Sequence, residues 1–308
     1  MIIQNNQSTI KKTIDSVSSL NAHFLFADIG CTDDTVKICK NYGEVISINF
    51  QNDLSAVRNE LCKKQTEWNL HLEPWEEIVS GIEEFFVLEK GKYRCNVIQN
   101  SLITKPIRIW CKNTKVQYKN PVFETITGEG SSTGIYIRSS SPDMTSRNLH
   151  LLEVWKAQNP IAFECHYYKA CILLTQKKWS EFLDVSNHFL FQEKRITMAS
   201  IMTRYYMAMV YCYVYKDYIK TLELLMFCLM EKPLMAEFWC LLGDVYYQTN
   251  EYSKAKCFYE NAKILGSRRL NSDDWPFDVP KYKTYPNQMI ASCDEIISKA
   301  IKIQSLVR

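Results

Sequence analysis

The sequence predicts an α/β domain with a mostly parallel sheet, followed by an all-α domain of helical repeats. In the first half, short apolar runs of strand character alternate four times with helix-like segments, which is typical of a parallel sheet covered by helices. From about residue 160 the apolar residues recur with the period of an α-helix. A length of 308 residues agrees with two domains. We expect boundaries at 1–145, 146–270 and 271–308, the last being a packing segment and a closing helix.

Local signals define the elements of the first half. Ser8 is a candidate N-cap for a helix that places Ile10 and Ile14 on one face. Thr32 or Asp33 can cap the next helix in the same way. The expected strands are residues 1–3, 23–28, 45–49 and 68–72, and the expected helices are 8–20, 36–42 and 54–64.

Polar side chains follow three of these strands. Asn5, Asp28 and Glu73 each lie at or near the carboxyl end of a strand-like run. Ligands of parallel α/β sheets bind at the carboxyl ends of the strands. The three residues together therefore indicate a binding site at one sheet edge, although each alone is also explained as a loop residue.

Seven segments of residues 1–160 resemble, in the same order, motifs of family-2 (GT-A) glycosyltransferases that carry helical repeats. The order makes the likeness much more specific than any single motif. The segments are 1–5 (M-I-I-Q-N, for M-I-V-K-N), 28–35 (D-I-G-C-T-D-D-T, for D-T-G-S-T-D-D-T), 53–59 (D-L-S-A-V-R-N, for D-F-S-x-A-R-N), 68–76 (W-N-L-H-L-E-P-W-E, for W-x-L-x-L-D-A-D-E), 108–110 (R-I-W, for R-L-F), 121–126 (P-V-F-E-T-I, for G-R-V-H-E-Q-I) and 146–153 (S-R-N-L-H-L-L-E, for R-N-L-x-L-L-E).

The resemblance implies a role for each candidate residue. Asn5 and Asp28 would bind the nucleotide of a nucleotide-sugar donor, and Arg58 would contact its base or diphosphate, which suits a planar forked donor. Glu73 would be what remains of a site for Mn²⁺ or Mg²⁺. Glu124 would be the general base that deprotonates the acceptor.

The chain departs from the family pattern at three places. Trp75 stands where the family has the second metal-binding Asp, and an indole cannot ligate a hard cation. Phe123 replaces the His before Glu124, and residues 134–141 lack a later His. Each change replaces a candidate ligand with an apolar or neutral group, so tight metal binding is not expected here.

Several explanations of these departures stay open. Arg58, Arg108, Arg138 or a lysine could neutralise the diphosphate without a metal, or Glu73 could pair with Glu76 as a shifted metal site. The site could also have decayed. Structural roles compete too: Asp28 could cap its turn, Arg58 could bridge two helices, and Glu124 could be an ordinary exposed carboxylate.

The second half resembles the tetratricopeptide repeat. Residues 236–246 followed by Tyr252, Ala255, Tyr259 and Ala262 match W-x-x-L-G-x-x-Y…A-x-x-x-F/Y-x-x-A. A weaker copy lies 34 residues earlier, at 202–235, and a looser hairpin precedes it at 163–191. An unrelated helical bundle is the alternative. Small residues such as Gly243 would allow the two helices of a hairpin to approach closely.

Stacked repeats form a concave face that binds partners. On the predicted register this face is aromatic and mildly acidic, so we expect it to hold a peptide or protein, or to mediate formation of a homo-oligomer. Its expected residues are Thr203, Tyr206, Val210, Tyr213, Glu237, Cys240, Asp244 and Tyr247.

Composition narrows the function classes. The net charge is +3 with no basic block, which argues against nucleic acid as the main partner. No run approaches 18 apolar residues and the first residues lack the pattern of a signal peptide, so we expect no membrane span and a cytoplasmic protein. The 12 cysteines show no C-x-x-C spacing, which favours reduced, buried thiols.

Two functions follow from these observations. The first is a family-2-like glycosyltransferase that transfers a sugar from a nucleoside-diphosphate donor to a peptide, protein or glycan acceptor. The alternative is a catalytically degenerate pseudo-glycosyltransferase, a scaffold whose repeats bind a protein partner. Nucleotide affinity separates the two hypotheses.

Overall fold

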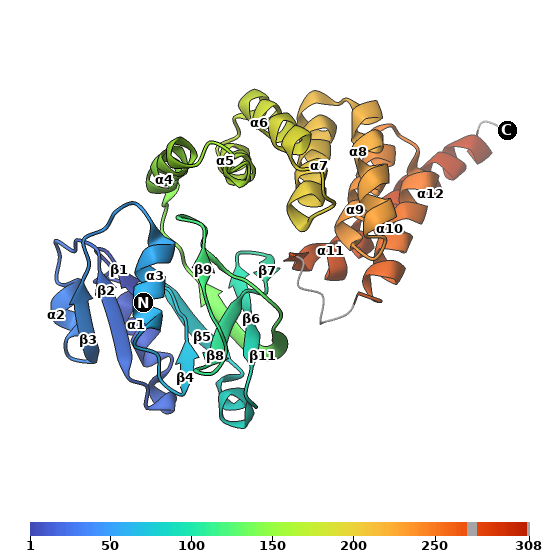
Figure 1. Ribbon diagram of the computed structural model, residues 1–308. Coiled ribbons are helices and arrows are strands. Elements are labelled where there is room, and N and C mark those ends of the chain that lie inside the picture. The colour runs from blue at the N-terminus through green and yellow to red at the C-terminus, as the bar shows by residue number, and fades with distance from the viewer. Residues whose placement is uncertain (270–275, 307–308) are drawn as a thin grey trace. The chain divides into compact units, whose positions relative to one another are not determined.

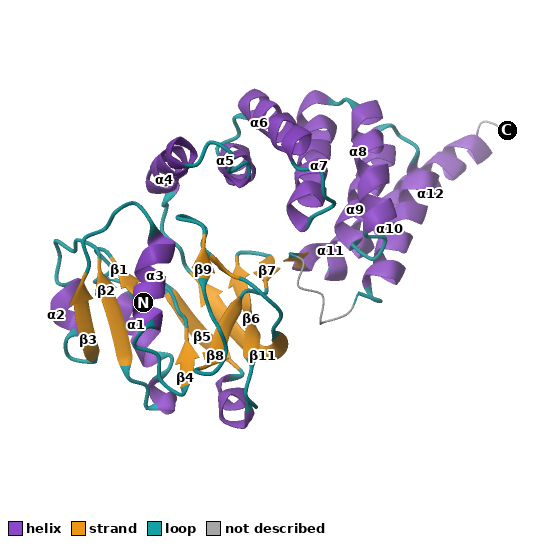
Figure 2. Cartoon of the chain, in the orientation of Figure 1, coloured by secondary structure: helices purple, strands orange, loops and turns teal. Residues whose placement is uncertain are grey.

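The computed structural model describes residues 1–269 and 276–306, and the chain forms two compact units (Figure 1). One unit contains Met1–Ala162 and the short stretch 276–277, and the other contains the helices that begin after Phe163. The first combines sheet and helix, and the second is almost entirely helical (Figure 2). The predicted combination of a sheet-containing first half and a helical second half is therefore confirmed.

A small parallel sheet opens the first unit. Its strand order is β1-β2-β3, with parallel pairing throughout. The helices bury their apolar side chains on it, and Ile10, Ile14 and Phe26 are each at most 3% exposed. The elements are β1 (Ile2–Ile3), α1 (Ile10–Asp15), β2 (Phe24–Asp28), α2 (Thr35–Cys39) and β3 (Gly43–Ser47).

A second, larger sheet is mixed, so the prediction of a mostly parallel sheet was wrong. Strands β4–β8, β6–β7, β6–β8 and β11–β5 pair antiparallel, and β11–β6 pairs parallel. The cause is visible in the connection between β6 and β7: Asn100, at φ 55°, turns the chain directly back, and a tight hairpin requires antiparallel strands. The strands are β4 (Trp68–Leu70), β5 (Glu76–Ser80), β6 (Lys92–Gln99), β7 (Leu102–Thr104), β8 (Ile107–Cys111) and β11 (Ser131–Ser139).

Helix α3 (Leu54–Cys62) carries one of the predicted site residues. Asp53 caps it by accepting a hydrogen bond from the Ala56 amide, at 2.9 Å. The Leu54 amide donates to the Pro121 carbonyl at 2.8 Å, which fixes the start of the helix against the loop between the paired strands β9 and β10. The remaining elements of this unit are β9 (Tyr118–Lys119), β10 (Thr125–Ile126) and α4 (Thr145–Gln158).

The second unit consists of helical hairpins, as predicted from the repeat pattern. A Cβ added to Gly243 would lie 2.6 Å from the ring of Tyr259, so the glycine is required for the close approach of α9 and α10. The hairpins are α5 (Glu164–Thr175) with α6 (Trp179–Gln192), α7 (Met198–Val210) with α8 (Tyr218–Glu231), and α9 (Ala236–Gln248) with α10 (Tyr252–Gly266). A π-helical turn, Tyr211–Tyr215, extends α7.

Five of the eight residues expected on the concave face of the repeats are buried, whereas Tyr213 is 39% exposed, so the prediction of an open face is corrected in part. Glu237 and Asp244 are each 3% exposed, and Thr203, Val210 and Cys240 are also buried. Asp244 accepts hydrogen bonds from the hydroxyls of Tyr259 and Tyr285, both at 2.6 Å. Tyr282 and Tyr285, which follow the last repeat, bond Glu237 and Asp244 and cover this part of the face, a packing role that periodicity does not reveal. The covering segments are α11 (Val279–Lys283) and α12 (Tyr285–Leu306).

Of the predicted packing segment 275–280, Trp275 lies outside the described residues, and Phe277–Asp278 forms the short strand β12. Among the described residues, no helix combines the length and apolar character that a membrane crossing requires.

Candidate functional site

Asn5 and Asp28 hold the turn that follows β2. Asp28 Oδ1 accepts hydrogen bonds from the amides of Gly30 (3.0 Å) and Cys31 (2.8 Å). Burial alone would raise the pKa of Asp28, but these two amides lower it below its usual value. Asn5, at φ 54°, accepts a hydrogen bond from the Thr32 amide at 2.7 Å. The turn-capping role weighed for Asp28 is therefore present, and nucleotide binding by these two residues remains a prediction.

The other three predicted residues come together around one guanidinium group. Arg58, on α3, donates from Nη2 to Glu73 Oε1 and from Nε to Glu124 Oε1, both at 2.6 Å. The side chains of Arg58 and Glu124 are 8% and 7% exposed, so Glu124 is not the exposed carboxylate considered from sequence. Phe123, in the left-handed region at φ 54°, precedes Glu124 in its loop.

Residues that the sequence did not single out complete this network. His71 Nε2 lies 2.7 Å from Arg58 Nη1 and 3.0 Å from Glu73 Oε1, and its Nδ1 lies 2.8 Å from the Tyr118 hydroxyl. The spacing of His71 and Glu73 was the available signal, because residues two apart on an extended strand share a face. Tyr118 carried no such signal, because it belongs to the short strand β9, far along the chain from His71.

Arg108 forms the second half of the network. Its Nη2 donates to Glu76 Oε1 at 2.7 Å, and its Nη1 lies 3.1 Å from His71 Nδ1. Glu76 Oε2 accepts from the Glu73 amide at 2.9 Å. Arg138, the third arginine weighed as a phosphate-binding group, is elsewhere: it pairs with Glu77 and its side chain is 60% exposed.

The arginines determine the protonation states of the buried acids. Burial opposes ionisation of Glu73, but the charge of Arg58, together with the hydrogen bond to His71 and the charge of Arg108, holds its pKa well below the usual range. Burial, reinforced by Arg58 and Arg108, lowers the pKa of His71 well below 6.5, so the imidazole is neutral at pH 7. Burial raises the pKa of Glu76 despite the nearby Arg108. We refer to Arg58, His71, Glu73, Glu76, Arg108, Tyr118 and Glu124 as the buried ion network.

The carboxylates of this network are already engaged by cations. Glu73 and Glu76, the shifted metal pair considered from sequence, each bond an arginine. A divalent cation at Glu73 Oε1 would therefore compete with the Arg58 guanidinium at 2.6 Å and face Arg108 at 3.9 Å. Within the described residues, no group of three His, Cys, Asp or Glu side chains has the arrangement of a metal site.

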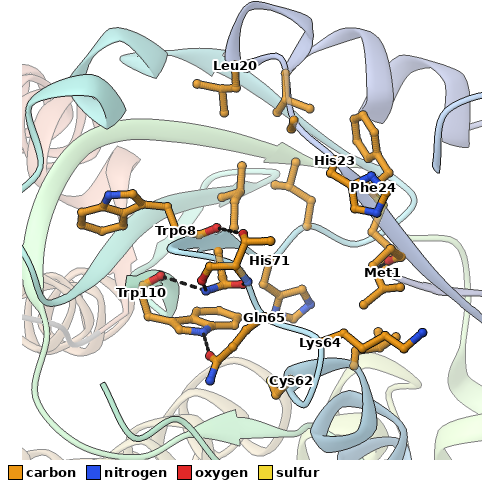
Figure 3. Close-up of a pocket in the computed structure, with 18 of the residues that line it drawn as sticks. Met1, Leu20, His23, Phe24, Cys62, Lys64, Gln65, Trp68, His71 and Trp110 are labelled. Carbon is orange, nitrogen blue, oxygen red and sulfur yellow. Dashed lines mark hydrogen bonds between the residues drawn. The ribbon is translucent and has the colours of Figure 1, made fainter. Parts of the chain in front are cut away.

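A pocket of about 420 Å³ lies beside the network (Figure 3). Arg58 forms part of its wall together with His71 and Tyr118, whereas the predicted site residues Asn5, Asp28, Glu73 and Glu124 do not. Met1 and Phe24 lie on one side of it and Trp68 on the other (Figure 3). Further lining residues come from the end of α3 and the start of β4.

Comparisons with known proteins add little to this description. No protein-family model matches the chain. No curated protein matches it significantly. Among solved structures, MamA (residues 41 to the end) from Desulfovibrio magneticus RS-1 is 17% identical with a TM-score of 0.39, covering 53% of this chain and 87% of its own. The Sgt2 TPR domain from Aspergillus fumigatus is 14% identical with a TM-score of 0.36, covering 46% of this chain and 82% of its own. Likeness at this level says nothing of function, and the helical hairpins are established by the structure itself.

Proposed function

We propose that this chain is a catalytically inactive, glycosyltransferase-like scaffold whose helical repeats bind a protein partner. The observation that carries the proposal is the bonding of Arg58 to both Glu73 and Glu124. The residue meant to bind the donor diphosphate is thereby paired with the proposed metal ligand and with the proposed general base.

This pairing opposes each step of the transferase mechanism. A general base must be able to reach the acceptor proton, but Glu124 is 7% exposed and its Oε1 is bonded to Arg58. A metal site needs free oxygen donors, and the family's second donor is Trp75 here. A diphosphate could recruit Arg58 only by depriving two buried carboxylates of their main counter-ion.

The repeats offer a different surface for a partner. On α8, Ile219, Met226 and Met230 are 74%, 53% and 77% exposed. Their spacing of seven and four residues places them on one helix face. Exposed Glu223 lies between Ile219 and Met226 on this face, so the two methionines form most of the apolar contact area, and methionine adapts to irregular partners. We call these three residues the α8 stripe and propose it as the partner surface, in place of the largely buried concave face.

Nucleotide titration tests the sheet unit. We expect no micromolar binding of UDP, GDP or their sugars by isothermal titration at pH 7, with or without Mn²⁺. Micromolar binding, or sugar transfer or hydrolysis above a heat-denatured control, would restore the transferase hypothesis.

Affinity purification tests the repeats. We expect a protein retained by the wild type to be lost from a Met226→Glu, Met230→Glu variant. Ser253→Glu, on exposed α10 surface, adds a charge away from the stripe and is the matched control. Equal retention by all three proteins would exclude the α8 stripe as the partner surface.

A further inference from the structure

The loops that connect successive hairpins of the repeats carry the same short pattern. The α6–α7 loop contains residues 193–196 (E-K-R-I), and the stretch from the end of α8 into the α8–α9 loop contains residues 231–234 (E-K-P-L). A large apolar residue is also the last but one of the helix before each loop, Phe191 in α6 and Met230 in α8. The pattern therefore recurs at the same place in consecutive repeats.

These two loops lie at the same edge of the repeats. The ring centroids of Tyr205 in α7 and Phe238 in α9 are 5.2 Å apart. The Tyr213 hydroxyl, just after α7, donates a hydrogen bond to Asp244, near the end of α9. Helices α7 and α9 therefore run side by side in the same direction. Since each loop leads into one of these two helices, both loops lie at the edge where α7 and α9 begin.

The apolar side chains at this edge are exposed. Phe191 and Met230 are 74% and 77% exposed. Ile196 is 59% exposed, Met198 at the start of α7 is 41% exposed, and Leu234 is 37% exposed. A single exposed apolar residue is normal on a protein surface, whereas a group that recurs in two repeats marks an interaction site. We call these five residues the apolar edge.

Cations accompany the apolar edge, and the acid between them is turned inward. Lys194 is exposed, and its Nζ lies 4.5 Å from the centroid of the Phe191 ring. The Arg195 side chain is 74% exposed, whereas that of Glu193 is 6% exposed. Glu193 Oε1 accepts hydrogen bonds from Arg195 Nε at 3.1 Å and from the Arg195 amide at 2.9 Å. Positive charge therefore reaches the solvent at this loop more than negative charge does.

This arrangement matches a flat anionic surface. Apolar side chains that project from loops can enter the headgroup region of a bilayer, and a lysine stem can lie along them while its amine stays among the phosphates. Glu231 and Lys232 of the second loop are both half-buried, so the first loop supplies most of the charge. A protein pocket would have to receive two projecting groups that are one repeat apart, whereas a membrane surface meets both without a matching shape.

We propose that the apolar edge docks this chain on the surface of a membrane that contains anionic lipids. Phe191 and Ile196 enter the headgroup region, and Lys194 and Arg195 contact the lipid phosphates. This is peripheral binding by loops, which requires no membrane-crossing helix. The α8 stripe shares only Met230 with the apolar edge, and the inference does not depend on a protein partner there.

Flotation of the full chain with lipid vesicles tests the charge contribution. We expect the chain to float with vesicles of phosphatidylcholine and phosphatidylserine, and to stay in solution with phosphatidylcholine alone. Lys194→Glu combined with Arg195→Gln should lower the partition coefficient about thirtyfold, because each basic residue near such a surface contributes roughly 1 kcal/mol. The matched control is Lys178→Glu combined with Lys177→Gln, in the exposed turn between α5 and α6 at the opposite edge, which should bind like the wild type.

A second pair of variants tests insertion of the apolar side chains. Phe191→Ser combined with Ile196→Ser should weaken vesicle binding about tenfold or more, because two apolar side chains no longer leave water. Ile219→Ser, at the other end of α8 and 74% exposed, is the matched control and should bind like the wild type. Brominated lipids should quench the added fluorescence of Ile196→Trp and not that of Ile219→Trp. Thermal unfolding, expected to be unchanged in every variant, separates lost docking from lost folding.

Three results would each overturn the proposal. The first is absence of flotation with the anionic vesicles. The second is equal binding by the variants of the apolar edge and their controls. The third is retention on immobilised polyglutamate in place of vesicle binding, which would identify an acidic protein as the occupant of this edge.

Discussion

Replacing Arg58 with Met tests the buried ion network most directly. The substitution keeps much of the side-chain volume but leaves Glu73 and Glu124, each 2.6 Å from the lost guanidinium, without their main counter-ion. Removing one partner of a buried pair destabilises a protein by roughly 3–5 kcal/mol. The two pairs share Arg58 and are not additive, so we expect about 4 kcal/mol at pH 7. The assay is urea unfolding, with hydrogen-exchange mass spectrometry of α3 and β4 to report this unit alone.

The pH dependence provides a second, independent check on Arg58→Met. In the wild type, the depressed pKa of Glu73 contributes stability that is present above its unfolded value, about 4.3, and is lost as the pH falls further. Without Arg58, burial raises the pKa of Glu73 and its protonation relieves the unpaired charge. The difference between variant and wild type should therefore shrink from pH 7 towards pH 4.5. Arg138→Met, which removes a surface pair, should cost below about 1 kcal/mol; equal effects of the two substitutions would refute the reasoning.

Three further predictions concern other contacts. Because the pKa of His71 is lowered in the fold, the unfolded state binds more protons than the folded state below pH 6.5. The stability of the wild type should therefore fall below pH 6.5 by up to about 1.4 kcal/mol per pH unit. His71→Gln should flatten this slope when urea unfolding is measured at a series of acidic pH values. Gly243→Ala should lower stability by about 1–3 kcal/mol in thermal unfolding, because its Cβ would overlap the Tyr259 ring, and an unchanged melting temperature would contradict the close helix packing. Tyr285→Phe removes a hydrogen bond to the buried Asp244 carboxylate and should cost about 1.5–3 kcal/mol, with faster proteolysis of α12; unchanged proteolysis would show that this bond does not hold the helix.

Local patterns predicted the elements better than their pairing. Helix periodicity located the hairpins of the second unit, and the small residue Gly243 marked the close contact of α9 with α10. The mixed sheet was missed because strand alternation does not encode strand direction. The direction of a strand depends on turns such as the one at Asn100. The positive φ of Asn100 could not be predicted before the hairpin was known.

The candidate site was predicted in part for the same reason. The resemblance named Arg58, Glu73 and Glu124 individually, and the fold brings the three side chains together. It did not reveal that they bond one another, because residues distant in sequence carry no sign of mutual pairing. The prediction for the repeat face was wrong for a different reason. Periodicity placed Glu237 and Asp244 on one face, but Tyr282 and Tyr285, which help to bury these two residues, come from outside the repeats.

The network also sets an upper bound on nucleotide affinity. For a diphosphate to use Arg58, the guanidinium must leave Glu73 and Glu124, and that step costs roughly 3–5 kcal/mol. An intrinsic micromolar affinity corresponds to about −8.2 kcal/mol, so the observed affinity would fall to about −4 kcal/mol, which is millimolar. Micromolar binding through Arg58 at pH 7 would therefore require an intrinsic affinity of about −12 kcal/mol, and the opened network would show faster exchange of the α3 amides in the complex. A nucleotide that bound at micromolar concentration and left α3 protected would have to bind without Arg58, away from the site that the sequence motifs indicate.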